Sequence, residues 1–477
     1  MRAADPSEPV SLPGGILPAV RAEGSRPRSS PFFRNRFARR IAAWCEAGLH
    51  ITALLFFPLL VVLPRGVAAL VSAAGLCAAG LVLSASGMRL TRILLVAAML
   101  LGGLLLWGTA SALWSVNPVR SLVVAARLAG LFAVGLALAA GAGMVAAPRR
   151  LTFLLLIGMA LGIAMVAIEL ATAGGLSSLV SDRAYRPTQL NQASISFALL
   201  VFPASALLIS LGQAIFATLL ATATAVTVYV LAGTSAKALL LAGLATGLLL
   251  HRARPVVAGA TVAISVLVII AAPLTFARLE RVPGLGETAD SFKISAGHRL
   301  LIWSFAGDRI AERPVTGWGL DASRAIPGGD DPIRPGEPWL PLHPHNAALQ
   351  VWLELGAPGA ALFAFLAAIV WGALARVEWP PLFAAAAGAS LTIAFIGCFA
   401  TYGIWQEWWL GTLSFSLFLV LVMARAAGSA ALPSDASASK GLLGAPAGHN
   451  VKIARPIRMR TITAIAYLTT RVNPSQV

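Results

Sequence analysis

The polar segment that ends the longest interruption in the apolar pattern of this chain carries two histidines, His343 and His345. Histidine is the side chain whose ordinary pKa, about 6.5, suits proton transfer near neutral pH. His345 is followed directly by Asn346, a residue that can cap the helix expected to start there. This position between a polar segment and an apolar helix makes His345 a candidate general base. His343 is a candidate to orient His345 or to bind a substrate.

The composition indicates a membrane protein. Of the 477 residues, 58% are hydrophobic and 12% are charged, which is too little charge to cover a water-soluble protein of this length. In a soluble protein the formal net charge of +17 would suggest nucleic acid as a partner. Here the basic residues gather in the tails and in turns between apolar stretches, where they serve topology and contacts with membrane lipids. We therefore expect no nucleic-acid partner.

Hydropathy predicts an all-α polytopic membrane protein with about twelve transmembrane helices, because one helical crossing takes about 20 mainly apolar residues. The candidate spans are 44–63, 66–86, 93–114, 119–141, 151–172, 191–211, 213–232, 236–250, 256–275, 346–375, 381–401 and 405–424. The chain then divides into a disordered N-terminal tail 1–43, transmembrane helices 1–9 in 44–275, a large loop 276–345, transmembrane helices 10–12 in 346–424, and a largely disordered C-terminal tail 425–477.

The basic residues predict the topology. With the N-terminus in the cytoplasm, parity places both tails on the cytoplasmic side together with four turns, near residues 89–92, 149–150, 252–254 and 376–378. This arrangement satisfies the positive-inside rule. The first apolar run follows an Arg-rich stretch without a small-residue cleavage motif, so we expect a retained signal anchor.

The loop 276–345 is expected on the periplasmic side as a structured lid, because long loops in compact proteins are usually functional or disordered. Apolar residues at helical spacing within 295–312 predict a short amphipathic helix on the membrane surface; they are Ile302, Phe305, Ala306 and Ile310. Pro314 ends this helix. The remainder of the loop is expected to be irregular.

The sequence from His345 to Gly359 resembles the signature of bacterial O-antigen ligases and the related O-antigen polymerases. His345-Asn346, nine further residues and Gly356-x-x-Gly359 fit the pattern H-[NSQ]-x9-G-x-x-G. Other segments are similar to parts of that family: Leu113–Pro118, Gln189–Gln192, Arg299-x-x-x-Trp303 and Pro314-x-x-Gly317-x-Gly319. The resemblance implies a GT-C-like fold with a large external loop before the signature.

The resemblance also implies an inverting, metal-independent transfer of a glycan from undecaprenyl diphosphate to an acceptor hydroxyl, without a cofactor. Lipid A-core or another glycan is the expected acceptor, and the inner membrane, with the active site facing the periplasm, is the expected location. A diphosphate leaving group develops negative charge, so its site requires fixed cations. Parity places Arg186, Lys237 and Arg299 on that side, and bidentate contacts make Arg186 and Arg299 the better candidates for a clamp.

We accordingly assign Arg299 with His345 to catalysis, and Arg186, Lys237 and His343 to substrate binding. Lys237 marks a departure from the family, many members of which have Ser-Arg-Gly where this chain has Ser235-Ala236-Lys237. Lysine keeps the charge but loses the two-pronged geometry of guanidinium.

Several polar and aromatic residues have alternative interpretations. Arg299 could instead form an ion pair with Asp308 or Glu312. Glu169 and Arg127 fall inside apparent spans, where ionisable residues are often functional but can also serve packing. A cluster at the start of the last span is interpreted as an aromatic belt, with sugar stacking as the alternative; it consists of Trp405, Trp408 and Trp409.

Three functions remain in competition. The signature spacing favours ligation over polymerisation by an O-antigen or exopolysaccharide polymerase of the same superfamily. A secondary transporter is the alternative from another class, although its binding residues would be expected near the midplane and in two related halves. The three cysteines do not have metal-ligand spacing, so we expect no metal site; they are Cys45, Cys77 and Cys398.

Overall fold

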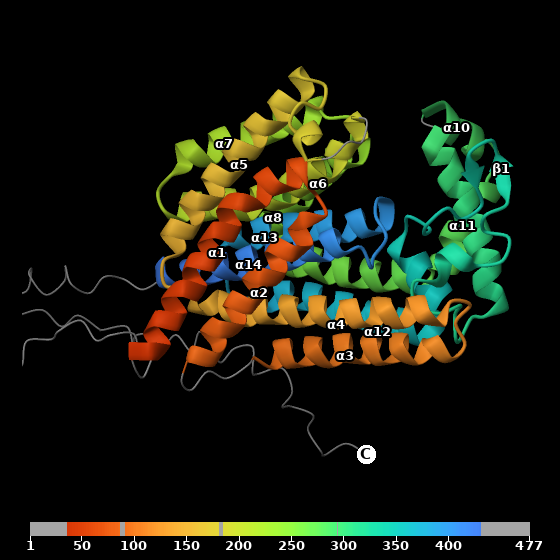
Figure 1. Ribbon diagram of the computed structural model, residues 1–477, viewed down its shortest axis with the longest axis horizontal. Helices are drawn as coiled ribbons and strands as arrows, with labels where there is room; N and C mark the ends of the chain where they lie inside the picture. Colours follow the sequence, from red (N-terminus) through yellow and green to blue (C-terminus); the bar gives the residue numbers. More distant parts are fainter. Residues whose placement is uncertain (1–35, 86–90, 181–184, 293, 431–477) are drawn as a thin grey trace, which may run out of the picture.

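The computed structural model describes residues 36–85, 91–180, 185–292 and 294–430 (Figure 1). Most of the two tails predicted to be disordered lies outside these residues. Where the tails are described they are helical, because α1 (Arg36–Val62) begins before residue 44 and α14 (Glu407–Ala430) continues past residue 424. Long basic side chains can reach the aqueous interface from such helix ends.

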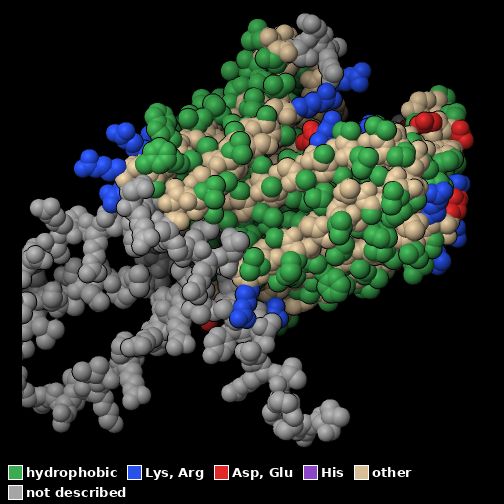
Figure 2. All heavy atoms as spheres, turned by 60° about the horizontal axis from the view of Figure 1, so that its bottom comes forward, with side chains coloured by type: hydrophobic (Ala, Val, Ile, Leu, Met, Phe, Trp, Pro, Cys, Tyr) green, Lys and Arg blue, Asp and Glu red, His purple; other side chains and the backbone are tan. Residues whose placement is uncertain are grey.

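The described residues form long apolar helices that confirm the all-α polytopic fold. Besides α1 and α14, the helices long and apolar enough to cross a membrane are α2 (Gly66–Ser84), α3 (Arg92–Ala110), α4 (Pro118–Gly141), α5 (Pro148–Ala171), α6 (Asn191–Ser210), α8 (Thr234–Ile270), α12 (Ala347–Arg376) and α13 (Pro381–Ala400). Helix α7 (Ala214–Val230) is apolar but shorter. In Figure 1, α3, α4 and α12 run nearly parallel, with α5 and α7 inclined against them. Figure 2 shows hydrophobic side chains over the flanks of the bundle and charged side chains towards its ends, as expected in a bilayer.

Helix α8 replaces two predicted spans, 236–250 and 256–275. At Ala253 (φ −140°, ψ 50°) the chain leaves the helical conformation, just before Pro255, which has no amide hydrogen to continue the helix. The two arms of α8 are therefore separate crossings. Among the described residues, ten helices meet the length and hydropathy criteria; counting α8 twice and adding α7 gives twelve crossings.

Contacts with α12 and α13 show that the arms of α8 run in opposite directions. In the second arm, Arg254 donates a hydrogen bond to the carbonyl of Trp379, just past the end of α12 (2.9 Å). The carbonyl of Ile269 accepts one from the indole of Trp352, near the start of α12 (2.8 Å). This arm is antiparallel to α12, while the first arm packs lengthwise against α13. Both ends of α8 thus lie at the same end of the bundle.

The loops gather at the two ends of the bundle. At one end, here called the site end, the segment 276–345 contacts the turn 111–117 and the α13–α14 turn, residues 401–406. At the opposite end, Arg425 of α14 donates a hydrogen bond to the carbonyl of Val145, in the α4–α5 connection (2.8 Å). The candidate base and the residues around it are at the site end.

Residues 276–345 form a structured cap across the site end. After the short α9 (Ala272–Thr275), the cap contains η5 (Phe276–Arg281), α10 (Leu285–Phe292), α11 (Ile294–Glu312), η6 (Ala322–Ala325), β1 (Pro332–Arg334) and β2 (Glu337–Pro338). The predicted amphipathic helix is α11, in which Ile302, Ala306 and Ile310 are buried. In Figure 1, α10 and α11 stand across the ends of the long helices.

The expectation of an irregular lid after α11 is wrong in one part. Strands β1 and β2 form an antiparallel hairpin with a two-residue connection, in which Gly336 has a positive φ of 78°. Arg334 fastens the hairpin to α10 through an ion pair with Asp290 (2.9 Å). Strands of two and three residues are too short to produce a detectable alternation in the sequence.

Cysteine labelling tests on which side the cap lies. In a background without Cys45, Cys77 and Cys398, we expect an Asp330→Cys protein to react with a membrane-impermeant maleimide in intact spheroplasts, because Asp330 is exposed in the cap. Glu378, exposed in the α12–α13 turn at the opposite end, gives the matched control. Glu378→Cys should react only after the membrane is opened, and the reverse order of reaction would overturn the predicted topology.

Candidate active site

His345 lies in the turn before α12, where a backbone carbonyl orients its ring. Its Nδ1 is 2.9 Å from the carbonyl oxygen of Thr401 in the α13–α14 turn. A carbonyl oxygen can only accept, so Nδ1 carries a hydrogen and donates it. In the neutral ring the lone pair is then on Nε2, and no described residue forms a hydrogen bond with that atom. His345 also has a positive φ of 55°, a conformation that is uncommon outside glycine and concentrated at functional sites.

His343 packs beside His345, with 4.3 Å between the ring centroids; the two are called the histidine pair below. The backbone amide of His345 donates to Nδ1 of His343 (3.1 Å), and Nε2 of His343 lies 3.3 Å from the amide nitrogen of Gln406. Burial, assisted by nearby charges, lowers the pKa of His343 to about 3. Burial also lowers the pKa of His345, although its hydrogen bond to Thr401 opposes the change. Both rings are therefore neutral near pH 7.

Arg299 of α11 meets the same turn as His345. Its guanidinium donates to the carbonyl of Ala400 (2.5 Å), the residue directly before Thr401. The alternative pairing with Asp308 or Glu312 is not observed, and no carboxylate of the described residues lies within ion-pair distance of Arg299. Arg299 and His345 bind consecutive carbonyls, and the charge of Arg299 contributes to the lowered pKa of both histidines. Arg299 thus has no counter-ion among the described residues and faces the candidate base.

Two buried polar residues of α12 hold the α13–α14 turn in place. The side-chain oxygen of Gln350 accepts a hydrogen bond from the amide of Ile404 (3.0 Å). One helical turn further on, Glu354 accepts from the indole of Trp405 (2.6 Å) and from the amide nitrogen of Gln350 (3.1 Å). Since Thr401 starts this turn and Ala400 directly precedes it, Gln350 and Glu354 help to fix the carbonyls that orient His345 and Arg299.

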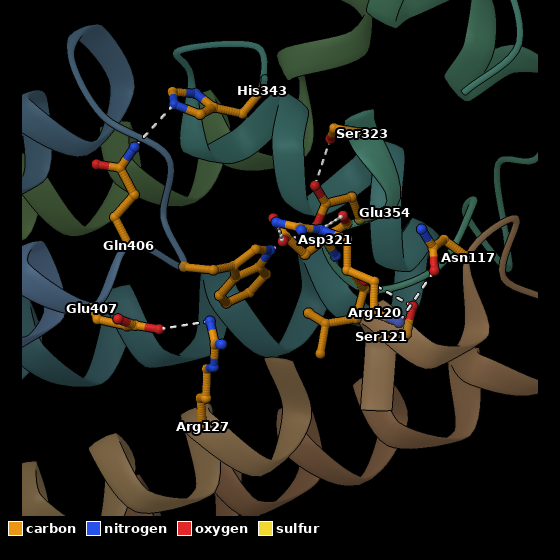
Figure 3. A network of polar contacts seen from close by, with 12 residues as sticks. Asn117, Arg120, Ser121, Arg127, Asp321, Ser323, His343, Glu354, Gln406 and Glu407 are labelled. Atoms are coloured by element: carbon orange, nitrogen blue, oxygen red, sulfur yellow. Dashed lines mark hydrogen bonds and ion pairs between the residues drawn. The ribbon is translucent and has the colours of Figure 1, made fainter. Parts of the chain in front are cut away.

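Glu354 also holds the cap. The hydroxyl of Ser323 donates to one carboxylate oxygen (2.5 Å), and the backbone amide of Asp321 donates to the other (2.7 Å; Figure 3). With the two contacts from Gln350 and Trp405, four donors surround a side chain that has no exposed surface. Glu354 was not among the predicted site residues, although an ionisable residue inside the predicted span 346–375 was a usable signal.

Helix α12 is interrupted at Gly356, the first glycine of the signature. Its backbone conformation (φ 62°, ψ −160°) is accessible almost only to glycine. Pro358 follows with no amide hydrogen to donate. The carbonyls of residues 353–355 and the amide of Ala357 therefore lose their partners within the helix. In a membrane-spanning helix such groups need partners from elsewhere in the protein.

The core of the cap supplies these partners. The amides of Trp318 and Gly319 donate to the carbonyls of Leu353 and Glu354 (both 2.9 Å), and the carbonyl of Pro314 accepts from Ala357 (2.9 Å). The indole of Trp107 donates to the carbonyl of Leu355 (2.8 Å). The two backbones touch so closely that a Cβ at Gly356 would lie 2.1 Å from the carbonyl oxygen of Val315. The segment Pro314-x-x-Gly317-x-Gly319 and Gly356 of the signature thus form one junction.

Two further residues, one from the signature and one from the segment Arg299-x-x-x-Trp303, have structural roles. The side chain of Asn346 accepts from the amides of Ala348 and Leu349 (3.0 and 3.2 Å) and caps α12, as expected. Trp303, four residues after Arg299, donates its indole hydrogen to the carbonyl of Pro344 (2.8 Å). Helix α11 therefore supports the backbone between the two histidines.

The structure does not bring the other two predicted cations into contact with this site. Arg186 is exposed directly before η4 (Pro187–Leu190), which leads into α6. Lys237 lies in the first turn of α8, with its Nζ 5.2 Å from the centroid of the Tyr229 ring. The starts of α6 and α8 pack together. Within the described part of the chain, no hydrogen bond or ion pair joins either residue to His345 or Arg299.

The aromatic-belt interpretation is wrong. Trp405, Trp408 and Trp409 are buried, and their indoles donate to Glu354, Gln406 and Cys398, respectively. A tryptophan of a belt would instead lie at the lipid interface. These residues build the α13–α14 turn and the start of α14.

Glu169 and Arg127, the two ionisable residues noted inside predicted spans, have different surroundings. Glu169 is buried and accepts hydrogen bonds from the amides of Leu176 and Ser177 (2.9 and 3.2 Å), so its role is structural. Arg127 is exposed and forms an ion pair with Glu407 (3.0 Å).

The fold and the site define a polytopic membrane protein that holds a neutral histidine and a guanidinium together beneath a cap. Residues 198–364 match the family described as O-Antigen ligase. The matched segment contains Lys237, Arg299 and the histidine pair. It confirms, over that segment, the resemblance that the sequence from His345 to Gly359 indicates.

Relatives of this chain occur in Rickettsia. A protein of Rickettsia conorii named "Putative polysaccharide ligase" is 37% identical over 135 residues, which are 28% of this chain and 33% of the relative. A protein of the same name from Rickettsia prowazekii is 39% identical over 120 residues, which are 24% of this chain and 29% of the relative. The chain thus matches these relatives over about a third of their length.

Substitution of Gly356 tests the junction between the cap and α12. Gly356→Ala should lower the free energy of unfolding by about 1–3 kcal/mol, because alanine cannot adopt this backbone conformation without strain. Thermal unfolding of the detergent-solubilised protein, followed by tryptophan fluorescence, measures the change. Gly102→Ala in α3, where a Cβ meets no atom within 4 Å, is the matched control and should not destabilise. Equal melting temperatures for Gly356→Ala and wild type would contradict the assignment.

Proposed function

We propose that this protein is a glycosyltransferase of the O-antigen ligase type. It transfers a glycan from undecaprenyl diphosphate to a hydroxyl of lipid A-core or of another glycan, at the periplasmic face of the bacterial inner membrane. The observation that carries the proposal is the pairing of His345 with Arg299 on the consecutive carbonyls of Thr401 and Ala400. The family match of residues 198–364 and the printed names of the relatives support it.

In this reaction the acceptor hydroxyl gives its proton to Nε2 of His345. The hydrogen bond from Nδ1 to Thr401 holds the ring in the required tautomer and supports the imidazolium that forms. As the proton leaves, the acceptor oxygen attacks the anomeric carbon, and the bond from that carbon to the diphosphate oxygen breaks. This single displacement is the inverting, metal-independent course that the resemblance implies.

Arg299 counters the negative charge that develops on the leaving diphosphate. A guanidinium without a carboxylate partner keeps its hydrogen-bond donors available for phosphate oxygens. Because α11 and the carbonyl of Ala400 hold Arg299 in place, little reorganisation is needed when the charge appears. A transporter gains no support from this arrangement, since the site lies at one end of the bundle rather than near its midplane.

Substitution of Arg299 tests the role of the cation. Arg299→Ala should lose most of the transfer activity, and Arg299→Lys should regain only part of it, because lysine cannot make a bidentate contact with phosphate. The measurement is the initial rate of transfer from a purified lipid-linked glycan in liposomes. Arg278→Ala, which changes an exposed arginine of the same cap, should keep the wild-type rate. Wild-type turnover by a folded Arg299→Ala protein would remove Arg299 from the mechanism.

His345→Ala tests the function as a whole. It should lower the single-turnover rate roughly 100- to 10,000-fold, the usual effect of losing a positioned base, while membrane insertion and donor binding persist. His251→Ala at the opposite end of the bundle, where the side chain is exposed, is the matched control. Glycan attached to lipid A-core marks ligation, whereas longer glycan on the lipid carrier marks polymerisation.

The pH dependence of the same assay has a predicted direction. Because burial lowers the pKa of His345, its neutral and base-competent form prevails above about pH 6.5. The wild-type rate should therefore change little from there to about pH 8 and fall on acidification, through a pKa below the ordinary value of about 6.5. A His345→Ala rate within a few-fold of wild type, with the same pH dependence, would make the role of His345 positional.

A further inference from the structure

A second group of arginines lies near the histidine pair, on the side of α4. Arg120 forms an ion pair with Asp321 and donates to its backbone carbonyl, and Arg127 pairs with Glu407 at 3.0 Å (Figure 3). Arg324 of η6 adds a third cation. Burial raises the pKa of Asp321, and the charges of Arg120, Arg324 and Arg127 oppose the rise. Three guanidinium groups therefore act on one carboxylate.

The α4 surface that carries Arg120 and Arg127 is open. The side chain of Arg127 is 60% exposed and that of Glu407 48%, although both belong to helices that cross the membrane. Val119 and Val123 are exposed on the same side of α4, and a Cβ at Gly130 would meet no atom within 4 Å. Charged groups next to lipid are unfavourable unless polar partners reach them. We call this surface the arginine face of α4.

The arginine face and Arg299 are connected to the histidine pair through different residues. Gln406, next to His343, directly precedes Glu407, the ion-pair partner on the arginine face. Arg299 instead comes from α11 and binds the carbonyl of Ala400. The two sets of cations therefore flank the α13–α14 turn, one at its start and the other just past its end. Figure 3 shows the Gln406 and Glu407 contacts on neighbouring positions.

We propose that the arginine face of α4 binds the phosphate groups of the acceptor lipid. The inference rests on the proposed transfer, in which two membrane-anchored substrates must reach one base. The donor diphosphate occupies the side of Arg299, so the acceptor approaches from the other side of the turn. The Arg127–Glu407 ion pair is exposed and contributes little stability, so Glu407 can release Arg127 to phosphate oxygens, which guanidinium binds bidentately. Arg120 keeps its less exposed ion pair with Asp321 and offers its remaining guanidinium donors to phosphate.

The spacing of the arginines indicates which headgroup fits. Arg120 and Arg127 are seven residues apart on one helix, so they are separated by roughly 10 Å along its axis. A single phosphate group is too small to bridge that separation. The face therefore suits a headgroup with two separated phosphates.

Binding of diphosphoryl lipid A tests this inference without any turnover. Native mass spectrometry of the full-length protein, titrated with this lipid, measures the dissociation constant. Arg120→Gln and Arg127→Gln should each weaken binding about tenfold, the effect of losing one hydrogen bond to a charged group. Glu407→Gln should tighten binding, because it removes the carboxylate that competes for Arg127. Arg278→Gln, an exposed site on the cap, is the matched control and should leave binding unchanged.

Two results would overturn the inference. The first is an unchanged affinity of Arg127→Gln or a weakened affinity of Glu407→Gln; tighter binding by Glu407→Gln, in contrast, cannot result from misfolding. The second is displacement of the lipid by an equal concentration of inorganic pyrophosphate, which would show recognition of phosphate alone.

The same titration separates this inference from the proposed function. His345→Ala should bind diphosphoryl lipid A as tightly as wild type does while failing to transfer glycan. If His345→Ala kept full transfer activity, the proposed role of the base would fail while the binding result stood. If binding were insensitive to Arg120 and Arg127 but transfer still required His345, the inference alone would fail.

Discussion

The break of α12 at Gly356 is the constraint on which the site end depends. A membrane-spanning helix cannot leave backbone groups without hydrogen-bond partners, and this break frees the carbonyls of residues 353–355. The cap and Trp107 satisfy them through main-chain and indole donors. The cap is thus attached to α12 in part through its own backbone. Because His345 lies just before the same helix, the break also fixes the base relative to the cap.

Glu354 connects this junction to the residues of the proposed reaction. A carboxylate without exposed surface is strongly unfavourable unless donors surround it, and Glu354 has four. Two of the donors belong to the cap, one to α12 and one to the α13–α14 turn. The carbonyls that orient His345 and Arg299 lie at the start of this turn and at the residue directly before it. Three segments far apart in the sequence are therefore positioned by one side chain.

Local patterns in the sequence predicted much of this arrangement, and long-range contacts explain what they missed. Hydropathy and helical period are local properties, so the apolar helices, α11 and the Asn346 cap of α12 were predicted. The spacing of the signature singled out His345. Its place inside an apolar span marked Glu354 as unusual, but its partners could not be predicted, because those in the cap and the turn are 31 to 51 positions away in the chain. Parity assigns Arg186 and Lys237 to an end of the bundle but not to a lateral position, and the structure leaves both without a direct contact to the site.

The placement of Arg299 also bears on when His345 becomes an effective base. The charge of Arg299, which no carboxylate of the described residues compensates, lowers the pKa of His345 in the same direction as burial. A diphosphate bound to Arg299 compensates that charge and adds negative charge of its own. By the same electrostatics, the affinity of His345 for a proton then rises towards that of an ordinary histidine. In the proposed reaction the base is therefore strengthened by the donor itself, so that proton abstraction from the acceptor hydroxyl is favoured when a glycan is present to be transferred.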